Sequence, residues 1–162
     1  MSQHIAIVEA DLGNPTHQDA IVHLVNAYAR DPMGGGRDLP EAVRTALIPR
    51  LQQHPTTVVF LAWYRDIPVG IAICFVGFST FMARPLLNIH DLAVIPAYRR
   101  QGVGRLLLER VAVKGQELGC CKLTLEVRAD NLSAQRLYEA VGFDNAASYG
   151  GAVRVWFLEK RL

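Results

Sequence analysis

The sequence predicts an α/β fold in which one domain, residues 1–162, forms a mixed, mostly antiparallel sheet of about six to seven strands flanked by about four helices. Strand-like and helix-like stretches alternate along the chain, and no stretch between them is long enough to be a linker that would divide it. Apolar residues make up 51% of the 162 positions, which is enough to bury one core.

The first third of the chain is predicted to form one strand and two helices. Residues 4–8 form the strand. Asn14 can cap a helix that has Pro15 at its first position, where a proline fits without losing a hydrogen bond. The apolar stripe of this helix consists of Ile21, Leu24, Val25 and Tyr28. A second helix covers residues 40–53 and is expected to be interrupted near Pro49.

The remaining two thirds are predicted to form a hairpin, two strand–helix units and a last strand. Residues 57–64 and 69–78 form the hairpin, with its turn at residues 65–68. A strand at residues 89–95 leads into a helix over about 102–118. The order is completed by a strand at 122–128, a helix at 131–141 that Gly142 ends, and a strand at 153–158.

Composition and charge argue against several classes of function. The net charge is +2 and the basic residues are scattered, except around Arg99, Arg100 and Arg105, so no nucleic-acid partner is expected. No apolar run has the length of a membrane span, and residues 1–9 lack the pattern of a signal peptide. The three cysteines, two of them adjacent, indicate a reduced cytoplasmic protein. The histidines show no metal-ligand spacing, so no metal is expected.

The most informative segment is the arginine–glycine turn, Arg99-Arg100-Gln101-Gly102-Val103-Gly104, between a strand and a helix. Such a turn presents backbone N–H groups, here from Arg100 to Arg105, at the positive end of the helix dipole, where a phosphate binds well. The side chains of Arg99 and Arg100 add charge. Solvated arginines and ordinary turn glycines are the alternative, but two glycines at a helix start are unfavourable unless the backbone is needed.

A second pattern lies on the helix at residues 131–141. Asn131 and Tyr138 are seven residues apart and therefore lie on one face, with the small Ala134 between them. A phenol at this place could donate a proton to a sulfur leaving group. Taken alone, however, the helix favours a simpler interpretation, in which Tyr138 belongs to the core stripe of an amphipathic helix.

Together the two motifs resemble those of the GCN5-related N-acetyltransferases (GNAT). The first is the segment from His90 to Gly104, and the second reads Asn131-x-x-Ala134-x-x-Leu137-Tyr138-Glu139-x-x-Gly142-Phe143. The resemblance implies acetyl-coenzyme A (acetyl-CoA) as co-substrate, direct acetyl transfer to a primary amine, and Tyr138 as general acid. It also implies a slot between two splayed strands, here those ending near Ile95 and Arg128. The cofactor-binding residues expected on this basis are Leu92, Ala93, Val94, Arg99, Arg100, Gln101, Gly102, Val103, Gly104, Arg105, Asn131 and Ala134.

The group that deprotonates the amine is predicted to be His90 or Asp91. A carboxylate or an imidazole near the strand end can do this through water. In an extended strand the two side chains point to opposite faces. Related polyamine acetyltransferases carry a Glu-Asp pair here, so His90 replaces the glutamate that acts as base in them. The structural alternatives are a hydrogen-bonded histidine of the sheet and a carboxylate that fixes a strand bulge.

The acceptor is expected to be a small-molecule or peptide amine. The resemblance places its site at residues 28–41, 78–87 and 146–151, and the glycine-rich loop 31–38 could be a lid over it or a surface connection. The aromatic segment 78–81 resembles that of diamine acetyltransferases, which makes a polyamine an alternative acceptor. The rival from another class is a catalytically silent acyl-CoA-binding sensor. A homodimer is compatible with the family likeness.

Overall fold

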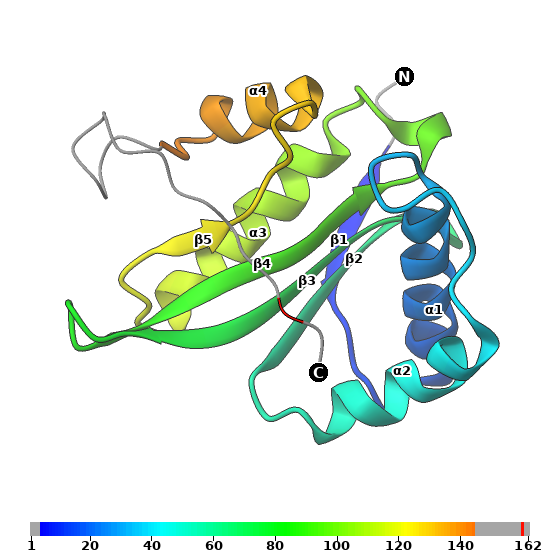
Figure 1. Ribbon diagram of the computed structural model, residues 1–162, viewed down its shortest axis with the longest axis horizontal. Helices are drawn as coiled ribbons and strands as arrows, with labels where there is room; N and C mark the ends of the chain where they lie inside the picture. The colour runs from blue at the N-terminus through cyan, green and yellow to red at the C-terminus, as the bar shows by residue number, and fades with distance from the viewer. Residues whose placement is uncertain (1–3, 145–159, 161–162) are drawn as a thin grey trace.

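The computed structural model describes residues 4–144 and 160. In chain order the elements are β1 (Ile5–Glu9), α1 (Pro15–Arg30), α2 (Glu41–Gln53), β2 (Thr57–Tyr64), β3 (Ile67–Ser79), β4 (Arg84–Val94), the 3-10 turn η1 (Pro96–Tyr98), α3 (Val103–Glu117), β5 (Leu123–Leu125) and α4 (Leu132–Ala140). The strands form one sheet in the order β1-β2-β3-β4-β5, with α1 and α2 on one face and α3 and α4 on the other (Figure 1).

The predicted α/β fold is confirmed. Strands β1 to β4 pair antiparallel and β5 joins β4 in parallel, so the sheet is mixed and mostly antiparallel. The described residues contain five strands, slightly fewer than predicted, and the strand expected at 153–158 lies outside them. Among the described residues, no helix has both the length and the apolarity needed to cross a membrane.

Two cores hold the helices against the sheet. On one face, α1 contributes Ile21 and Leu24, which pack with β2 and β3 side chains such as Leu61. On the other face, the buried side of α3 packs on the same strands, with Leu107 and Val111 fully buried. Both layers use the helical spacing of apolar residues that the sequence shows. As a result, α1 and α3 cover opposite faces of β4, which therefore runs through the middle of the molecule.

Several boundaries differ from the prediction. The hairpin turn has only two residues, because β3 begins at Ile67 and includes Pro68, which pairs opposite Trp63 at a register shift where a ladder hydrogen bond is not required. Helix α2 is continuous through Pro49. Its neighbours Ile48 and Leu51 are buried against the sheet, and this packing outweighs the hydrogen bond that the proline removes. Strand β4 begins at Arg84, because its pairing with β3 extends to Ser79.

The loop between α1 and α2 is fixed to the end of α1. The Asp31 carbonyl accepts hydrogen bonds from the N–H groups of residues 34, 35 and 36, and the Asp31 side chain accepts one from Met33 N at 2.9 Å. Gly34 packs so closely on the Tyr28 carbonyl that a Cβ atom there would overlap it. These contacts give residues 31–36 a defined conformation.

We expect Gly34→Ala to destabilise the protein by about 1–3 kcal/mol, because the added methyl group meets backbone that cannot move aside without shifting the end of α1. Urea unfolding measures the change as a lower midpoint. An unchanged midpoint would show that the loop rearranges freely, as a mobile surface connection does.

Candidate active site

A gap opens between β4 and β5 halfway along β4. The two strands pair only from Leu87↔Leu123 to Ile89↔Leu125, after which β5 ends and β4 continues to Val94. The backbone of β4 beyond Ile89 pairs with β3 on one side, and no strand of the described residues pairs with it on the other. The sequence predicted splayed strands ending near Ile95 and Arg128, but the shorter strand already ends at Leu125. Apart from the Val94 carbonyl, which accepts a hydrogen bond from Arg99, the N–H and C=O groups along this edge can pair with the amides of an extended ligand.

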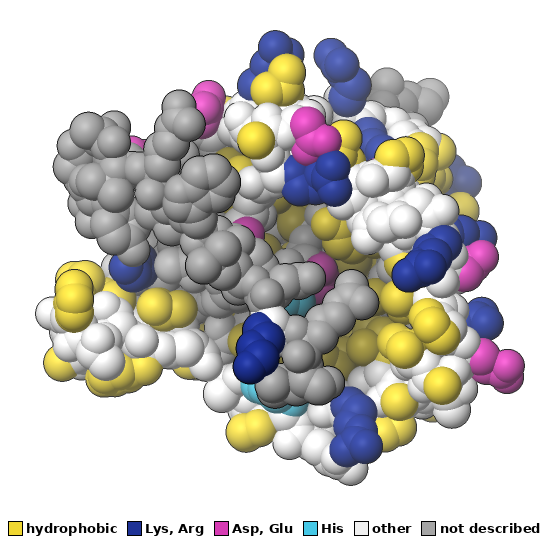
Figure 2. Space-filling view, in the orientation of Figure 1, with side chains coloured by type: hydrophobic (Ala, Val, Ile, Leu, Met, Phe, Trp, Pro, Cys, Tyr) yellow, Lys and Arg dark blue, Asp and Glu magenta, His cyan; other side chains and the backbone are white. Residues whose placement is uncertain are grey.

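A cavity of about 390 Å³ occupies this gap. In Figure 2 this face of the molecule is hollowed, and apolar side chains form much of the wall. The predicted cofactor-binding residues that line it are Leu92, Ala93, Val94, Arg99, Arg100, Gly102, Val103, Gly104, Arg105, Asn131 and Ala134. Tyr138 lines it as well, whereas Gln101, His90 and Asp91 are not part of the lining. The two sequence motifs therefore meet at one cavity.

The arginine–glycine turn brings unpaired backbone donors to this cavity. Gly102 is the N-cap of α3, has φ +84°, and gives the helix no side-chain cap. The first N–H groups of α3 therefore remain available to an anion. Arg100 also has a positive φ of 61°, which is unfavourable for a residue with a side chain. The turn is thus held in a conformation that exposes donors rather than in the one of lowest local energy.

We expect Gly102→Ala to lower the free energy of unfolding by about 1–2 kcal/mol, because alanine strains at positive φ, and also to raise the Kd for coenzyme A. Gly119→Ala is the matched control: Gly119 follows α3 at φ +69°, and neither glycine has an atom within 4 Å of an added Cβ. Thermal unfolding and calorimetry measure the two effects. An equal change in the Kd for coenzyme A in both variants would show that the arginine–glycine turn is not part of the binding site.

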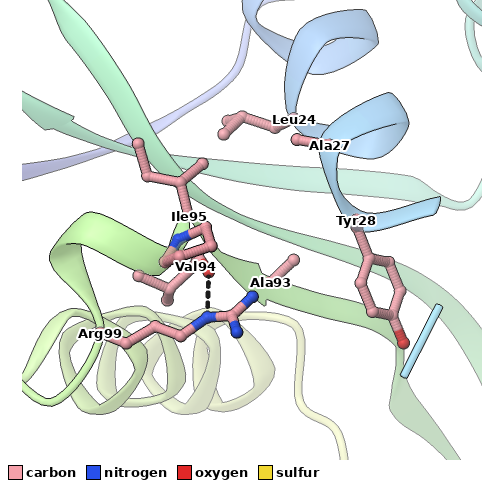
Figure 3. Close-up of a pocket in the computed structure, with 8 residues that line it drawn as sticks. Leu24, Ala27, Tyr28, Ala93, Val94, Ile95 and Arg99 are labelled. Carbon is pink, nitrogen blue, oxygen red and sulfur yellow. Dashed lines mark hydrogen bonds between the residues drawn. The ribbon is translucent and has the colours of Figure 1, made fainter. Parts of the chain in front are cut away.

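Four of the predicted cofactor-binding side chains already have structural partners, and one of them is Arg105, which lies 4.0 Å from Glu109 on α3. Arg99 donates from Nε to the Val94 carbonyl at 2.8 Å (Figure 3) and from its Nη2 to Asp31 at 2.6 Å. Gln101 donates to the Ala97 carbonyl at 2.9 Å, and Asn131 accepts from Ala134 N as the N-cap of α4. The bond from Arg99 lowers the pKa of Asp31. Arg99 therefore ties the arginine–glycine turn to the α1–α2 loop.

Tyr138 reaches the cavity from α4. Its ring packs on Phe143 at a centroid distance of 5.8 Å and borders the core on the α3 side. Burial, and to a smaller extent the neighbouring Tyr28, raises the pKa of Tyr138 to about 12. The two interpretations of this helix are therefore compatible, because the same side chain is partly buried in the core and lines the cavity. At neutral pH the phenol keeps its proton and can only donate it.

A β-bulge places His90 and Asp91 on the same face of the sheet, so the prediction of opposite faces is wrong. Ile73 pairs with Asp91 and Cys74 with Ile89, which leaves His90 as the extra residue of β4. Ile73 belongs to the core under α1, and the His90 ring contacts Phe75 of the same face at 5.6 Å. One inserted residue reverses the alternation that an unbroken strand would keep. Burial raises the pKa of Asp91, and the charge of His90 opposes this shift.

The lining also includes residues outside the predicted cofactor set. They are Tyr28, Asp31, Met33, Tyr98, Ser133 and Leu137. Tyr28 also lines a small second cavity with Leu24 and Ala93, and its ring lies beside β4 in Figure 3. In the sequence, the sign that Tyr28 lines a cavity was its position at the end of an apolar stripe, just before a glycine-rich loop. That signal indicated a core residue equally well.

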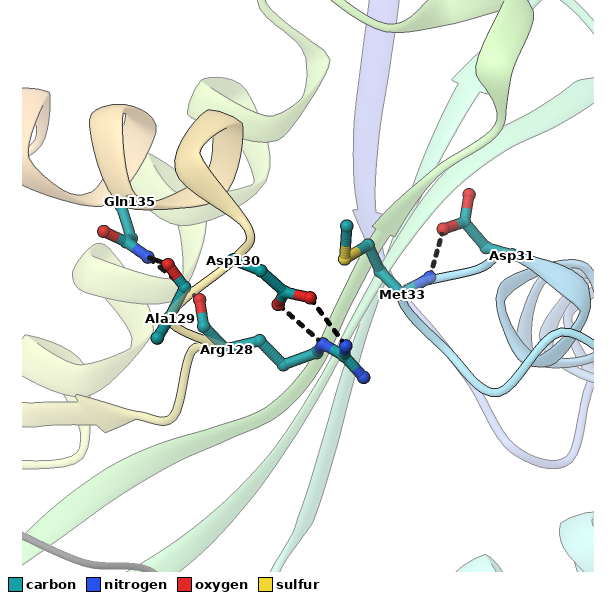
Figure 4. A network of polar contacts seen from close by, with 6 residues as sticks. All are labelled: Asp31, Met33, Arg128, Ala129, Asp130 and Gln135. Atoms are coloured by element: carbon teal, nitrogen blue, oxygen red, sulfur yellow. Dashed lines mark hydrogen bonds and ion pairs between the residues drawn. The ribbon is translucent and has the colours of Figure 1, made fainter.

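The rim opposite the α1–α2 loop is formed by the segment that follows β5. Arg128 binds Asp130 through two hydrogen bonds, at 2.9 and 2.8 Å, and Gln135 donates to the carbonyl groups of Arg128 and Ala129. Figure 4 shows the Arg128 guanidinium pointing toward the loop that carries Met33. Within the described ranges, no cluster of three metal-ligating side chains is present.

The family comparison agrees with this geometry. The model of the Acetyltransferase (GNAT) family matches residues 21–143, which include both motifs and every described residue that lines the cavity. The chain belongs to the GNAT acetyltransferase family. The resemblance that the motifs indicated is thereby confirmed.

Two curated relatives and one solved structure illustrate the likeness. The [ribosomal protein bS18]-alanine N-acetyltransferase of Escherichia coli K12 is 47% identical over 59 residues, 36% of this chain and 40% of that enzyme. The thialysine N-epsilon-acetyltransferase of Bos taurus is 35% identical over 74 residues, 46% of this chain and 43% of that enzyme. The chain thus spans about two fifths of the length of these relatives. A crystal structure described as a probable acetyltransferase is 25% identical, with a TM-score of 0.80, and the match covers 96% of this chain and 98% of the other.

Proposed function

We propose that this GNAT protein is an N-acetyltransferase that moves an acetyl group directly from acetyl-CoA to a primary amine of a small molecule or peptide. The observation that carries the proposal is the meeting of three features at one cavity. These are the unpaired edge of β4, the exposed N–H groups of the arginine–glycine turn, and the protonated Tyr138. Both curated relatives described above are named for the acetylation of an amine.

The residues present fit acetyl-CoA. The backbone of residues 92–94, apart from the Val94 carbonyl that Arg99 occupies, offers amide partners along an edge that no described strand covers. The start of α3 offers N–H groups to a pyrophosphate. Acetyl-CoA, when bound, supplies the acetyl group as a reactive thioester. The chain supplies binding, orientation and proton transfer, and neither motif contains a cysteine that could carry the acetyl group covalently.

The group that stabilises the leaving sulfur and the group that accepts the proton of the amine lie on different elements. Tyr138 on α4 donates to the sulfur as negative charge develops on it. On β4, Asp91 or His90 accepts the proton that the attacking ammonium must lose, either directly or through water. Burial raises the pKa of the Asp91 carboxyl above its ordinary value, which makes its carboxylate a stronger base than an exposed one.

The test is a thiol-release assay with acetyl-CoA and a panel of amines, which includes amino acids, peptides with free N-termini, aminoglycosides, aryl amines and polyamines. We expect turnover with at least one class. Calorimetry on the same protein measures acetyl-CoA binding separately. Binding without turnover on any amine would contradict the enzyme and support an acyl-CoA sensor.

A further inference from the structure

Tyr28 lies beside the part of β4 that follows the bulge. It follows Leu24 by one helical turn on the buried stripe of α1, and it lines both cavities together with Ala93. Asp91 precedes Ala93 by two residues on the same face of the sheet. The charge of Asp91 accordingly contributes to the raised pKa of Tyr28, after burial. The phenol of Tyr28 therefore stands at the cavity wall with the Asp91 carboxylate nearby on the same face.

Asp31 lines the cavity, and Asp91 and Asp130 each lie next to a lining residue, Leu92 and Asn131. These three carboxylates differ in whether a cation neutralises them. Asp31 is paired with Arg99 at 2.6 Å, and Asp130 with Arg128 at 2.8 Å. In contrast, no hydrogen bond or ion pair to the Asp91 carboxylate occurs within residues 4–144. The neighbouring His90 interacts with this carboxylate through its charge. A partly buried carboxylate without a fixed partner stabilises a cation that comes close to it.

We propose that Tyr28 and Asp91 form the acceptor subsite, that this subsite receives a single ammonium group, and that it therefore selects monoamines over diamines and polyamines. The Tyr28 oxygen accepts a hydrogen bond from the acceptor, while the negative charge of Asp91 balances its one positive charge. A second ammonium would meet carboxylates that are already neutralised. On the opposite rim it would meet Asp130 only as one half of the ion pair with Arg128 (Figure 4).

This inference rests on the proposed acetyl transfer, and it gives Tyr28 a role in binding the acceptor rather than the cofactor. It also weakens the case for a polyamine, which the aromatic segment 78–81 suggested. A polycation would need clustered carboxylates, and the sequence offers Asp31, Asp38 and Glu41 for this. Asp38 is paired with Arg30 at 3.6 Å and Asp31 with Arg99, whereas Glu41 is exposed at the start of α2, outside the cavity lining.

The experiment compares pentylamine with cadaverine, which have the same carbon chain but one and two ammonium groups at pH 8. We expect kcat/KM to be at least about tenfold higher for pentylamine, because the second charge of cadaverine lacks a partner. Tyr28→Phe should raise the KM for pentylamine while leaving the Kd for coenzyme A unchanged. Thermal unfolding of each variant verifies that it is folded.

Arg128→Gln tests the rim independently. The substitution breaks the ion pair and leaves Asp130 as an unpaired carboxylate that can hold a second ammonium, so the cadaverine-to-pentylamine ratio of kcat/KM should rise by about threefold or more. Arg136→Gln, on exposed α4 surface outside the cavity lining, should leave the ratio unchanged. Equal or faster turnover of cadaverine by the wild-type protein would contradict the proposed acceptor subsite and leave the proposed acetyl transfer standing. Acetyl-CoA binding without thiol release from any amine would overturn the proposed function as well.

Discussion

Tyr138→Phe is expected to lower kcat by about 100-fold or more, with the Kd for acetyl-CoA unchanged. Phenylalanine keeps the ring that packs on Phe143 and removes only the hydroxyl, so the fold and the cavity wall are preserved. The pKa of Tyr138, about 12, lies well above that of an alkyl thiol, so complete proton transfer to the sulfur is unfavourable. The hydroxyl acts mainly by donating a hydrogen bond to the sulfur as its charge develops.

Single-turnover kinetics and calorimetry on the same preparation measure the two quantities. Because the phenol stays protonated throughout the pH range of an enzyme assay, the alkaline side of the pH–rate profile should not reflect its ionisation. Full activity of the variant would show that the Tyr138 hydroxyl has no catalytic role and that Tyr138 serves only as a core residue, as the apolar stripe of α4 suggested. A parallel loss of binding would indicate that the cavity had collapsed rather than lost a donor.

Asp91→Asn is expected to lower kcat/KM for the amine by about 100-fold or more and to make the protein more stable at neutral pH. Burial raises the pKa of Asp91 above its unfolded value. Because the folded state holds the proton more tightly than the unfolded state, protonated Asp91 stabilises the fold fully at a pH below the pKa of the unfolded chain. This stabilisation is lost as the pH rises through the pKa of the folded protein. At pH 7 the folded protein therefore bears the cost of a buried charge, which asparagine does not carry.

Thermal unfolding at pH 7 and at about pH 4 measures this effect, and the advantage of the variant should shrink at the lower pH, where the carboxyl begins to protonate. Asp66→Asn, in the exposed β2–β3 turn, is the matched control and should change neither activity nor stability. A variant that is less stable than the wild type at pH 7 would show that Asp91 fixes the bulge, which is the structural alternative that the sequence left open.

The sequence predicted well those features that are encoded within one or two helical turns. The cap at Asn14, the apolar stripe of α1 and the start of α3 at Gly102 depend on neighbouring residues, and the structure shows each of them. The gathering of both motifs at one cavity was predicted through the family likeness. The spacing of Asn131 and Tyr138 alone favoured a core helix.

The features that escaped prediction depend on contacts between distant segments. Nothing near Arg99 in the sequence indicates that its guanidinium binds Asp31, which lies 68 residues earlier. The bulge at His90 arises from the register of β4 against β3, and a register shift of one residue reverses which face a side chain occupies.

By itself, then, the sequence determined the order of the elements as far as α4, the arginine–glycine turn at the start of α3, and the family to which the chain belongs. Periodicity, capping and glycine spacing act over a few residues and can be read along the chain. Only the tertiary structure decided that Asp91 lies on the face of Tyr28, that Asp31 is neutralised and that Arg128 borders the opposite rim. Burial and charge pairing depend on which segments the fold brings together, and so the electrostatics of the acceptor subsite follow from the packing of α1 and the β5–α4 segment around β4.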